Sequence, residues 1–298
     1  MQTLAVWKPG SATLALGVNI LGCGMAYAYP GAGALDISLC HYEGSRLLFR
    51  GPARRLDRPF VAVLGASESY GKYVERPYAD LIQGRLGLNV VNLSCVNAGV
   101  DVFLNEEPIT RIAARAEVAI VQVMGVQNTS NMFYSVHPRR NDRFLGATPL
   151  LQSMFPSVDF TEFSFTRHML CVLLAHSPEK FAVVAAELRR AWSARMKALT
   201  ERLPRQRILL WMGNVPPPAT STQNLSGDPI MVDAQMIAAL RPHFTHYAQV
   251  TPSHEATVEG GAGRVFSQMD EVAALALPGQ SFHRDVAACL GDLLEKMI

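Results

Sequence analysis

The stretch "FVAVLGASESYGK" (residues 60–72) joins an apolar run to a glycine and several small hydroxyl residues. Ser67 stands two residues after Gly65, where a buried strand would end and a helix would begin. A serine in this place can attack an acyl carbonyl when a neighbouring base takes its proton. The alternative is that Ser67 only caps the helix. The sequence leaves both interpretations open.

Two better-known motifs do not fit this stretch. A phosphate-binding loop needs four residues between its glycines and a Ser or Thr after the lysine. Gly65 and Gly71 are separated by five residues, and Tyr73 follows Lys72. The nucleophile elbow G-x-S-x-G needs a second glycine where Ser69 stands. The stretch therefore predicts neither a nucleotide site nor an α/β-hydrolase elbow.

A second group of polar residues lies in "NTSNMFYSVHPRRNDRF" (128–144), after the strongest predicted strand. Arginine, asparagine, tyrosine and histidine side chains donate the hydrogen bonds that a carboxylate, phosphate or sulfate accepts. The predicted substrate-binding residues are Asn131, Tyr134, His137, Arg139, Arg140 and Arg143. The alternative is a solvated loop with local ion pairs.

Composition limits the classes of function. The chain has 298 residues, of which 49% are hydrophobic and 17% charged, and its net charge is +2. These values indicate a substantial core, no disordered character and no nucleic-acid partner. The five cysteines lack C-x-x-C spacing and the eight histidines lack H-x-x-x-H spacing. We therefore expect reduced thiols, no metal site and no cofactor.

Apolar, strand-like runs alternate with segments of helical spacing. Strands are predicted at 60–65, 89–94, 117–125, 207–213 and 246–252, and helices at 78–87, 108–116, 177–203 and 282–297. This alternation, without hairpin signals, predicts a three-layer α/β/α fold around a mostly parallel five-stranded sheet. In such sheets the functional groups gather at the carboxyl ends of the strands. Ser67 and the segments 94–99 and 125–131 follow predicted strands there.

These segments resemble the blocks of the SGNH (GDSL-like) hydrolase superfamily from about residue 60 to the C-terminus. Ser67 stands in the place of the G-D-S serine, and Gly99 near that of the oxyanion glycine. Asn128 lies close to the third-block asparagine, and His283 stands at the D-x-x-H histidine. The resemblance implies an SGNH/flavodoxin-like sheet. It also implies Ser67 as nucleophile, His283 as general base, and Gly99 and Asn128 as oxyanion donors.

The acid of the superfamily's triad is missing, because Gln280 replaces the aspartate that would orient His283. In a serine protease, a neutral residue at this place lowers kcat about 10⁴-fold. One interpretation is a serine esterase or acyltransferase with a degenerate site, acting on a polar or anionic ester, which could be a glycan. The alternative is a non-catalytic SGNH-fold protein that holds an anionic ligand or partner with residues 128–143.

The N-terminal part is predicted to differ from the rest. Residues 1–58 are expected to form an extension that packs on a single domain of residues 59–298. Residues 1–24 are either signal-like or lie upstream of a start at Met25, and they are too short to span a membrane. The cysteines favour the cytoplasm, and a signal peptide over 1–28 would imply the periplasm. Segments such as "HPRRNDRFL" also resemble an uncharacterised proteobacterial family.

Overall fold

A computed structural model describes residues 32–220 and 223–298. The interpretations of residues 1–24 and 1–28 fall outside the described residues. Within the described part, no helix combines the length and the apolar character needed to cross a membrane.

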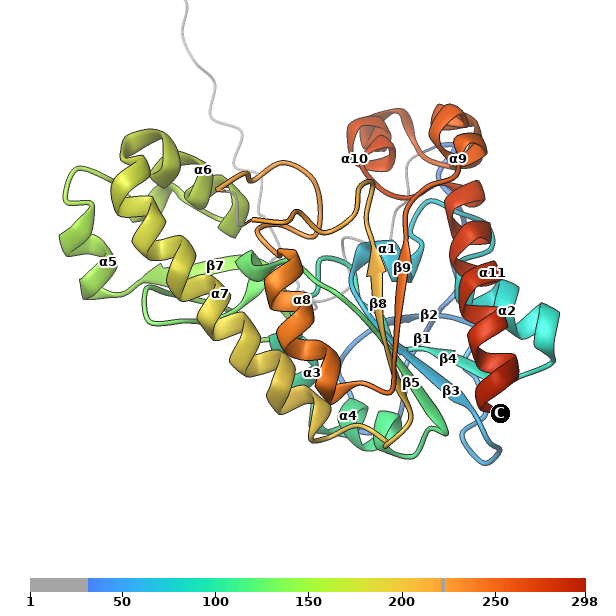
Figure 1. The fold of residues 1–298 in the computed structure, drawn as a ribbon. Coiled ribbons are helices and arrows are strands. Elements are labelled where there is room, and N and C mark those ends of the chain that lie inside the picture. The colour runs from blue at the N-terminus through green and yellow to red at the C-terminus, as the bar shows by residue number, and fades with distance from the viewer. Residues whose placement is uncertain (1–31, 221–222) are drawn as a thin grey trace, which may run out of the picture.

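Five parallel strands form the central sheet. They are β3 (Val61–Leu64), β4 (Val90–Asn92), β5 (Val118–Gln122), β8 (Arg207–Met212) and β9 (His246–Val250). Their order across the sheet is β4-β3-β5-β8-β9, and every neighbouring pair is parallel (Figure 1). Numbered along the chain this is the flavodoxin-like order 2-1-3-4-5. The prediction of a five-stranded parallel sheet is confirmed.

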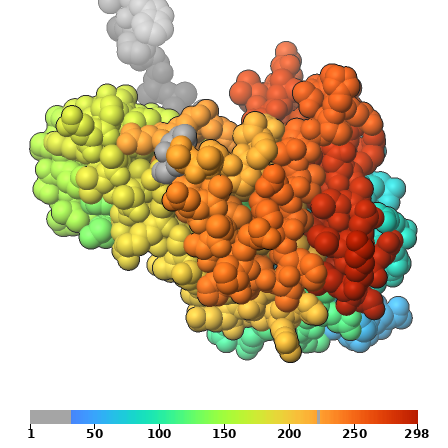
Figure 2. All heavy atoms as spheres, viewed as in Figure 1, coloured from blue at the N-terminus to red at the C-terminus, as the bar shows by residue number. Residues whose placement is uncertain are grey.

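Helices cover both faces of this sheet (Figure 1). The helices α2 (Tyr78–Leu86) and α11 (Gln280–Met297) lie on one face, and α3 (Val100–Asn105), α4 (Glu107–Ala114), α7 (Pro178–Thr200) and α8 (Ala234–Leu240) on the other. Successive residues of a strand point to opposite faces. Accordingly, Val61 packs with the α2–α11 layer and Ala62 with the α7 layer. Drawn as spheres, the yellow α7 and the red α11 lie on opposite sides of the molecule (Figure 2).

The remaining elements lie around this core. They are β1 (Leu39–Cys40), β2 (Phe49–Arg50), α1 (Ser67–Tyr70), β6 (Tyr134–His137), β7 (Arg140–Ala147), α5 (Pro149–Met154), α6 (Thr166–His176), α9 (His254–Val258) and α10 (Glu271–Leu275), with short 3₁₀ turns at 126–128, 160–162, 241–243, 260–263 and 268–270.

An antiparallel hairpin replaces the loop predicted within residues 128–144. It is formed by β6 and β7. In β6, Tyr134 and Val136 are buried while Ser135 between them is exposed. This alternation is the period of a half-buried strand. The many arginines and asparagines of the segment make this alternation hard to recognise in the sequence.

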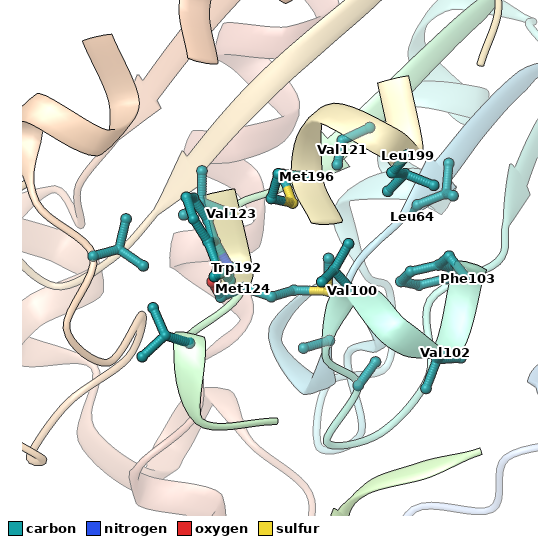
Figure 3. Packing of buried hydrophobic residues seen from close by; sticks show 14 of the residues in the cluster. Leu64, Val100, Val102, Phe103, Val121, Val123, Met124, Trp192, Met196 and Leu199 are labelled. Carbon is teal, nitrogen blue, oxygen red and sulfur yellow. The ribbon is translucent and has the colours of Figure 1, made fainter. Parts of the chain in front are cut away.

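Trp192 fixes α7 against the carboxyl end of β5 (Figure 3). Its side chain is fully buried, and its indole Nε1 donates a hydrogen bond of 2.8 Å to the carbonyl of Met124. Met124 lies two residues beyond the end of β5. The longest helix is thereby attached where the polar residues of this sheet edge begin.

We expect Trp192→Phe to lower the free energy of unfolding by about 2–3 kcal/mol. The smaller ring leaves a gap, and the buried carbonyl of Met124 loses its donor. Urea unfolding followed by circular dichroism measures the change. Val183→Ala is the control, because Val183 is exposed on the same helix, and it should change stability by less than about 0.5 kcal/mol. Equal losses in the two variants would contradict the role of Trp192.

Candidate active site

Ser67 is the first residue of α1, directly after the turn that ends β3. Its side chain is 6% exposed and lines a cavity of about 610 Å³. The Ser67 hydroxyl donates to Asn97 Oδ1 at 3.0 Å and accepts the backbone N–H of Asn97 at 2.8 Å. Ala66, not Ser67, is the N-cap of the helix, so the capping interpretation is wrong.

Asn97 is the residue that the sequence analysis missed here. Its φ is +56°, a left-handed conformation that asparagine adopts more readily than most residues. Its side chain donates to Asp142 Oδ2 at 3.2 Å, and its carbonyl accepts a bond of 3.0 Å from Asn128 Nδ2. The sequence signals it only by an asparagine before two small residues, in the segment that follows a predicted strand. The Ser67 hydroxyl is thus held by a loop that two other segments brace.

Gly99 does not present a free N–H to this cavity. Its backbone N–H donates to Asn141 Oδ1 at 3.1 Å. A Cβ at this position would lie 2.0 Å from the carbonyl oxygen of Asn128, so only glycine fits. Gly99 therefore allows the loops after β4 and β5 to touch, and the N–H beside the serine belongs to Asn97.

Asn128 does line the cavity, as expected for a residue after β5. Both ends of its amide are bonded. Nδ2 holds the carbonyl of Asn97, and Oδ1 accepts a bond of 2.8 Å from Thr166 Oγ1. Its orientation is consequently fixed, and one hydrogen of Nδ2 remains beyond the bond to Asn97.

A second group of polar residues lines the same cavity as Ser67. Glu68 is 9% exposed and accepts a bond of 2.8 Å from Gln122 Nε2. The same amide accepts the backbone N–H of Ala66 through Oε1 at 2.9 Å. Asp228, from the segment after β8, forms an ion pair of 2.7 Å with Arg167. The polar side chains that these bonds connect all line the cavity: Glu68, Gln122, Arg167 and Asp228.

The surroundings of Glu68 disfavour its charged form. Burial, and then the negative charge of Asp228, raise the pKa of Glu68 to about 7. The bond from Gln122 acts in the opposite direction and is outweighed. The sequence offered one signal for this cluster, a glutamine that ends the otherwise apolar run of β5.

His283 lies elsewhere, although it was predicted as the general base. It is fully buried and is not one of the residues that line the cavity. Its ring stacks on Tyr78 with centroids 5.9 Å apart, and Nδ1 accepts the backbone N–H of Tyr78 at 3.1 Å. The helix α11 begins at Gln280, two residues before its predicted start, and His283 in its first turn points inward toward α2.

Neither the charge nor the partner of His283 suits a base beside Ser67. Burial, followed by the positive charges of Arg50 and Arg264, lowers the pKa of His283 to about 3. Gln280, in the place of the triad acid, bonds instead to the backbone N–H and carbonyl of Arg76.

Most of the residues predicted to hold an anion form hydrogen bonds that stabilise the hairpin itself. Asn131 Oδ1 accepts the N–H of Phe133, and the buried Tyr134 hydroxyl donates to the carbonyl of Gln127. None of the six predicted side chains lines the cavity: Asn131, Tyr134, His137, Arg139, Arg140 and Arg143.

Three of the remaining four lie at the turn of the hairpin, and Arg143 lies within β7. His137 Nδ1 accepts the backbone N–H groups of Arg139 and Arg140, each at 3.2 Å. The guanidinium of Arg143 lies 4.1 Å from the ring centre of Phe165, which borders the cavity. Within 128–143, the cavity is lined by Asn128 and by Asp142, which was not a predicted site residue.

Residues 25–298 match one protein family, described as a domain of unknown function (DUF6473). The chain belongs to the DUF6473 family. A search of the curated proteins finds no match to it.

Several solved structures resemble the DUF6473 chain at low identity. A mutant of Axe2, an acetyl-xylooligosaccharide esterase from Geobacillus stearothermophilus, shares 12% identity with a TM-score of 0.40, over 80% of this chain and 94% of that one. A putative GDSL-like lipase from Parabacteroides merdae shares 11% identity with a TM-score of 0.40, over 83% and 100%. The lipase Lip_vut3 from goat rumen metagenome shares 12% with a TM-score of 0.37, over 78% and 97%.

We expect His283 to make the protein sensitive to acid. The folded state keeps the ring neutral down to about pH 3, whereas an unfolded histidine takes up a proton near pH 6.5. The stabilising contribution is therefore complete above pH 6.5 and is lost as the pH falls toward 3. In His283→Gln, the free energy of unfolding should fall less steeply between pH 6.5 and 4. The difference in slope should correspond to the uptake of about one proton.

Urea unfolding at several pH values measures this slope. Glutamine can still accept the N–H of Tyr78, and comparison with the wild type cancels the other titrating groups. His246→Gln, at an exposed position on β9, is the control and should keep the wild-type slope. Identical slopes for His283→Gln and the wild type would refute the expectation.

Proposed function

We propose that this DUF6473 protein is an SGNH-type serine hydrolase or acyltransferase, with Ser67 as its nucleophile. The observation that carries the proposal is the position of the Ser67 hydroxyl. It lies at the carboxyl end of β3, faces a cavity of about 610 Å³, and is oriented by two bonds to Asn97. Open parallel sheets place their reactive groups at this edge.

The loops around Ser67 would stabilise the charge that develops in acyl transfer. When the Ser67 oxygen attacks a carbonyl carbon, the carbonyl oxygen becomes negative and needs fixed hydrogen-bond donors. We assign this role to the remaining amide hydrogen of Asn128 and, in place of that of Gly99, to the backbone N–H of Asn97, which the Ser67 oxygen releases as it bonds to the acyl carbon. Both groups are held by the contact between the loops after β4 and β5.

The charges in the cavity favour a neutral, polar substrate over the anionic one first considered. Its lysine and its arginine are already paired, Arg167 with Asp228 at 2.7 Å and Lys72 with Asp270 at 3.6 Å. Apolar side chains such as Met124 also contribute to the lining. An ester or acyl group on a hydroxyl-rich molecule, such as an acylated glycan, fits this mixture.

One observation favours a second candidate function, ligand binding without turnover. The Ser67 hydroxyl donates to an amide oxygen of Asn97, which is not a base at neutral pH. His283 is buried, with its ring stacked on Tyr78 and bonded to the backbone N–H of that residue. In this case the same cavity would hold the same class of polar molecule.

Labelling with a fluorophosphonate serine probe distinguishes the two candidates. We expect the wild type to be labelled and Ser67→Ala to be unlabelled, because the probe reacts only with an activated hydroxyl. Ser69→Ala is the matched control, since the Ser69 hydroxyl bonds to Tyr78 and does not line the cavity. It should be labelled like the wild type. A folded wild type that stays unlabelled would exclude a nucleophilic Ser67 and support the binding function.

A further inference from the structure

A nucleophilic serine needs a proton acceptor, and among the described residues no histidine or carboxylate is hydrogen-bonded to the Ser67 hydroxyl. The hydroxyl donates to an amide oxygen, and His283 does not reach the cavity lining. The acceptor should therefore be sought among the titratable and charged side chains that do line the cavity. These include Glu68, Lys72, Asp142, Arg167, His168 and Asp228.

Most of these groups are already engaged or face solvent. Lys72 pairs with Asp270, and Arg167 pairs with Asp228. Asp142 is partly exposed and accepts the side-chain amide of Asn97. His168 is exposed on α6, with its ring edge-on to Phe163 at 5.1 Å. Among the described residues lining the cavity, Glu68 is the buried carboxyl group that forms no ion pair.

The backbone and one amide place Glu68 next to the nucleophile. The two residues are consecutive in the single turn of α1. Gln122 holds the carboxyl group through Nε2 and the peptide N–H just before Ser67 through Oε1. Gln122 consequently holds Glu68 directly and Ser67 through the preceding residue, and both residues line the same cavity.

We propose that Glu68 is the general base that activates Ser67. This assignment rests on the proposed function of the cavity. The Ser67 proton passes through one water to the Glu68 carboxylate as the bond from Oγ to the acyl carbon forms. Glu68 then returns that proton to the leaving alkoxide as the carbon–oxygen bond breaks. In the second half, a water or an acceptor alcohol attacks the acyl-serine, its proton goes to Glu68, and Ser67 Oγ recovers it on leaving.

The electrostatic surroundings support a base that works near neutral pH. Burial and the charge of Asp228 raise the pKa of Glu68 to about 7, close to the optimum for general base catalysis. The charged groups that act on it are Asp228 and, in the opposite direction, Arg167 on α6. Gln122 on β5 and the phenol of Tyr78 on α2 are neutral in this range. Lys72, Asp142 and His168 share the lining.

The test is the rate of fluorophosphonate labelling of Ser67 as a function of pH. In the wild type the rate should rise with pH and level off above about 7, where Glu68 is ionised. Glu68→Gln should label at least about 100-fold more slowly and should lose this pH dependence. Glu68→Asp keeps a carboxylate and should recover part of the rate.

Two further variants separate a catalytic role from a structural one. Asp228→Asn removes a negative charge that raises the pKa of Glu68, so the midpoint of the profile should move to lower pH. A purely structural Glu68 would not produce this shift. Glu187→Gln makes the same chemical change at a buried glutamate outside the cavity, and its profile should match that of the wild type. Circular dichroism establishes that each variant is folded.

The possible results distinguish the assignment of Glu68 as general base from the proposed function on which it rests. Labelling of Glu68→Gln at the wild-type rate and with the wild-type profile would overturn Glu68 as the base and leave Ser67 as nucleophile. A folded wild type that is not labelled at any pH would overturn both. A slow, pH-independent Glu68→Gln together with a shifted Asp228→Asn profile would establish the assignment.

Discussion

The side-chain amide of Gln122 is the contact on which this sheet edge depends. It ends β5 and is 2% exposed, so both of its polar ends must find partners within the protein. One end takes the N–H of Ala66 and the other gives a hydrogen to Glu68. A single buried group thus ties the turn after β3 to the neighbouring strand, and it holds the carboxyl group of Glu68.

Around this contact the cavity has two kinds of polar lining. Neutral donors and acceptors come from the loop at Asn97 and from the amide of Asn128. Carboxyl groups come from residues such as Glu68 and Asp142. Ser67 lines the same cavity, so an ester bound at its hydroxyl would meet fixed donors and titratable acids together.

The sequence predicted the framework better than the groups that do the chemistry. Continuous apolar runs identified the strands, and the parallel arrangement placed Ser67 and Asn128 at one edge, because both depend on local pattern. The direction of the His283 ring depends on how α11 packs against α2, which the residues around it do not reveal. Asp228 joins Glu68 only through the fold, across 160 positions of chain, so no local spacing could reveal it.

The absence of a side chain at Gly99 has a consequence for the whole family. The loops after β4 and β5 approach so closely there that a single methyl group would collide with the carbonyl of Asn128. A relative with a larger residue at this position must hold the two loops farther apart. Position 99 is therefore a marker, readable from sequence alone, of which DUF6473 proteins can form the same pocket and which have reshaped it for something else.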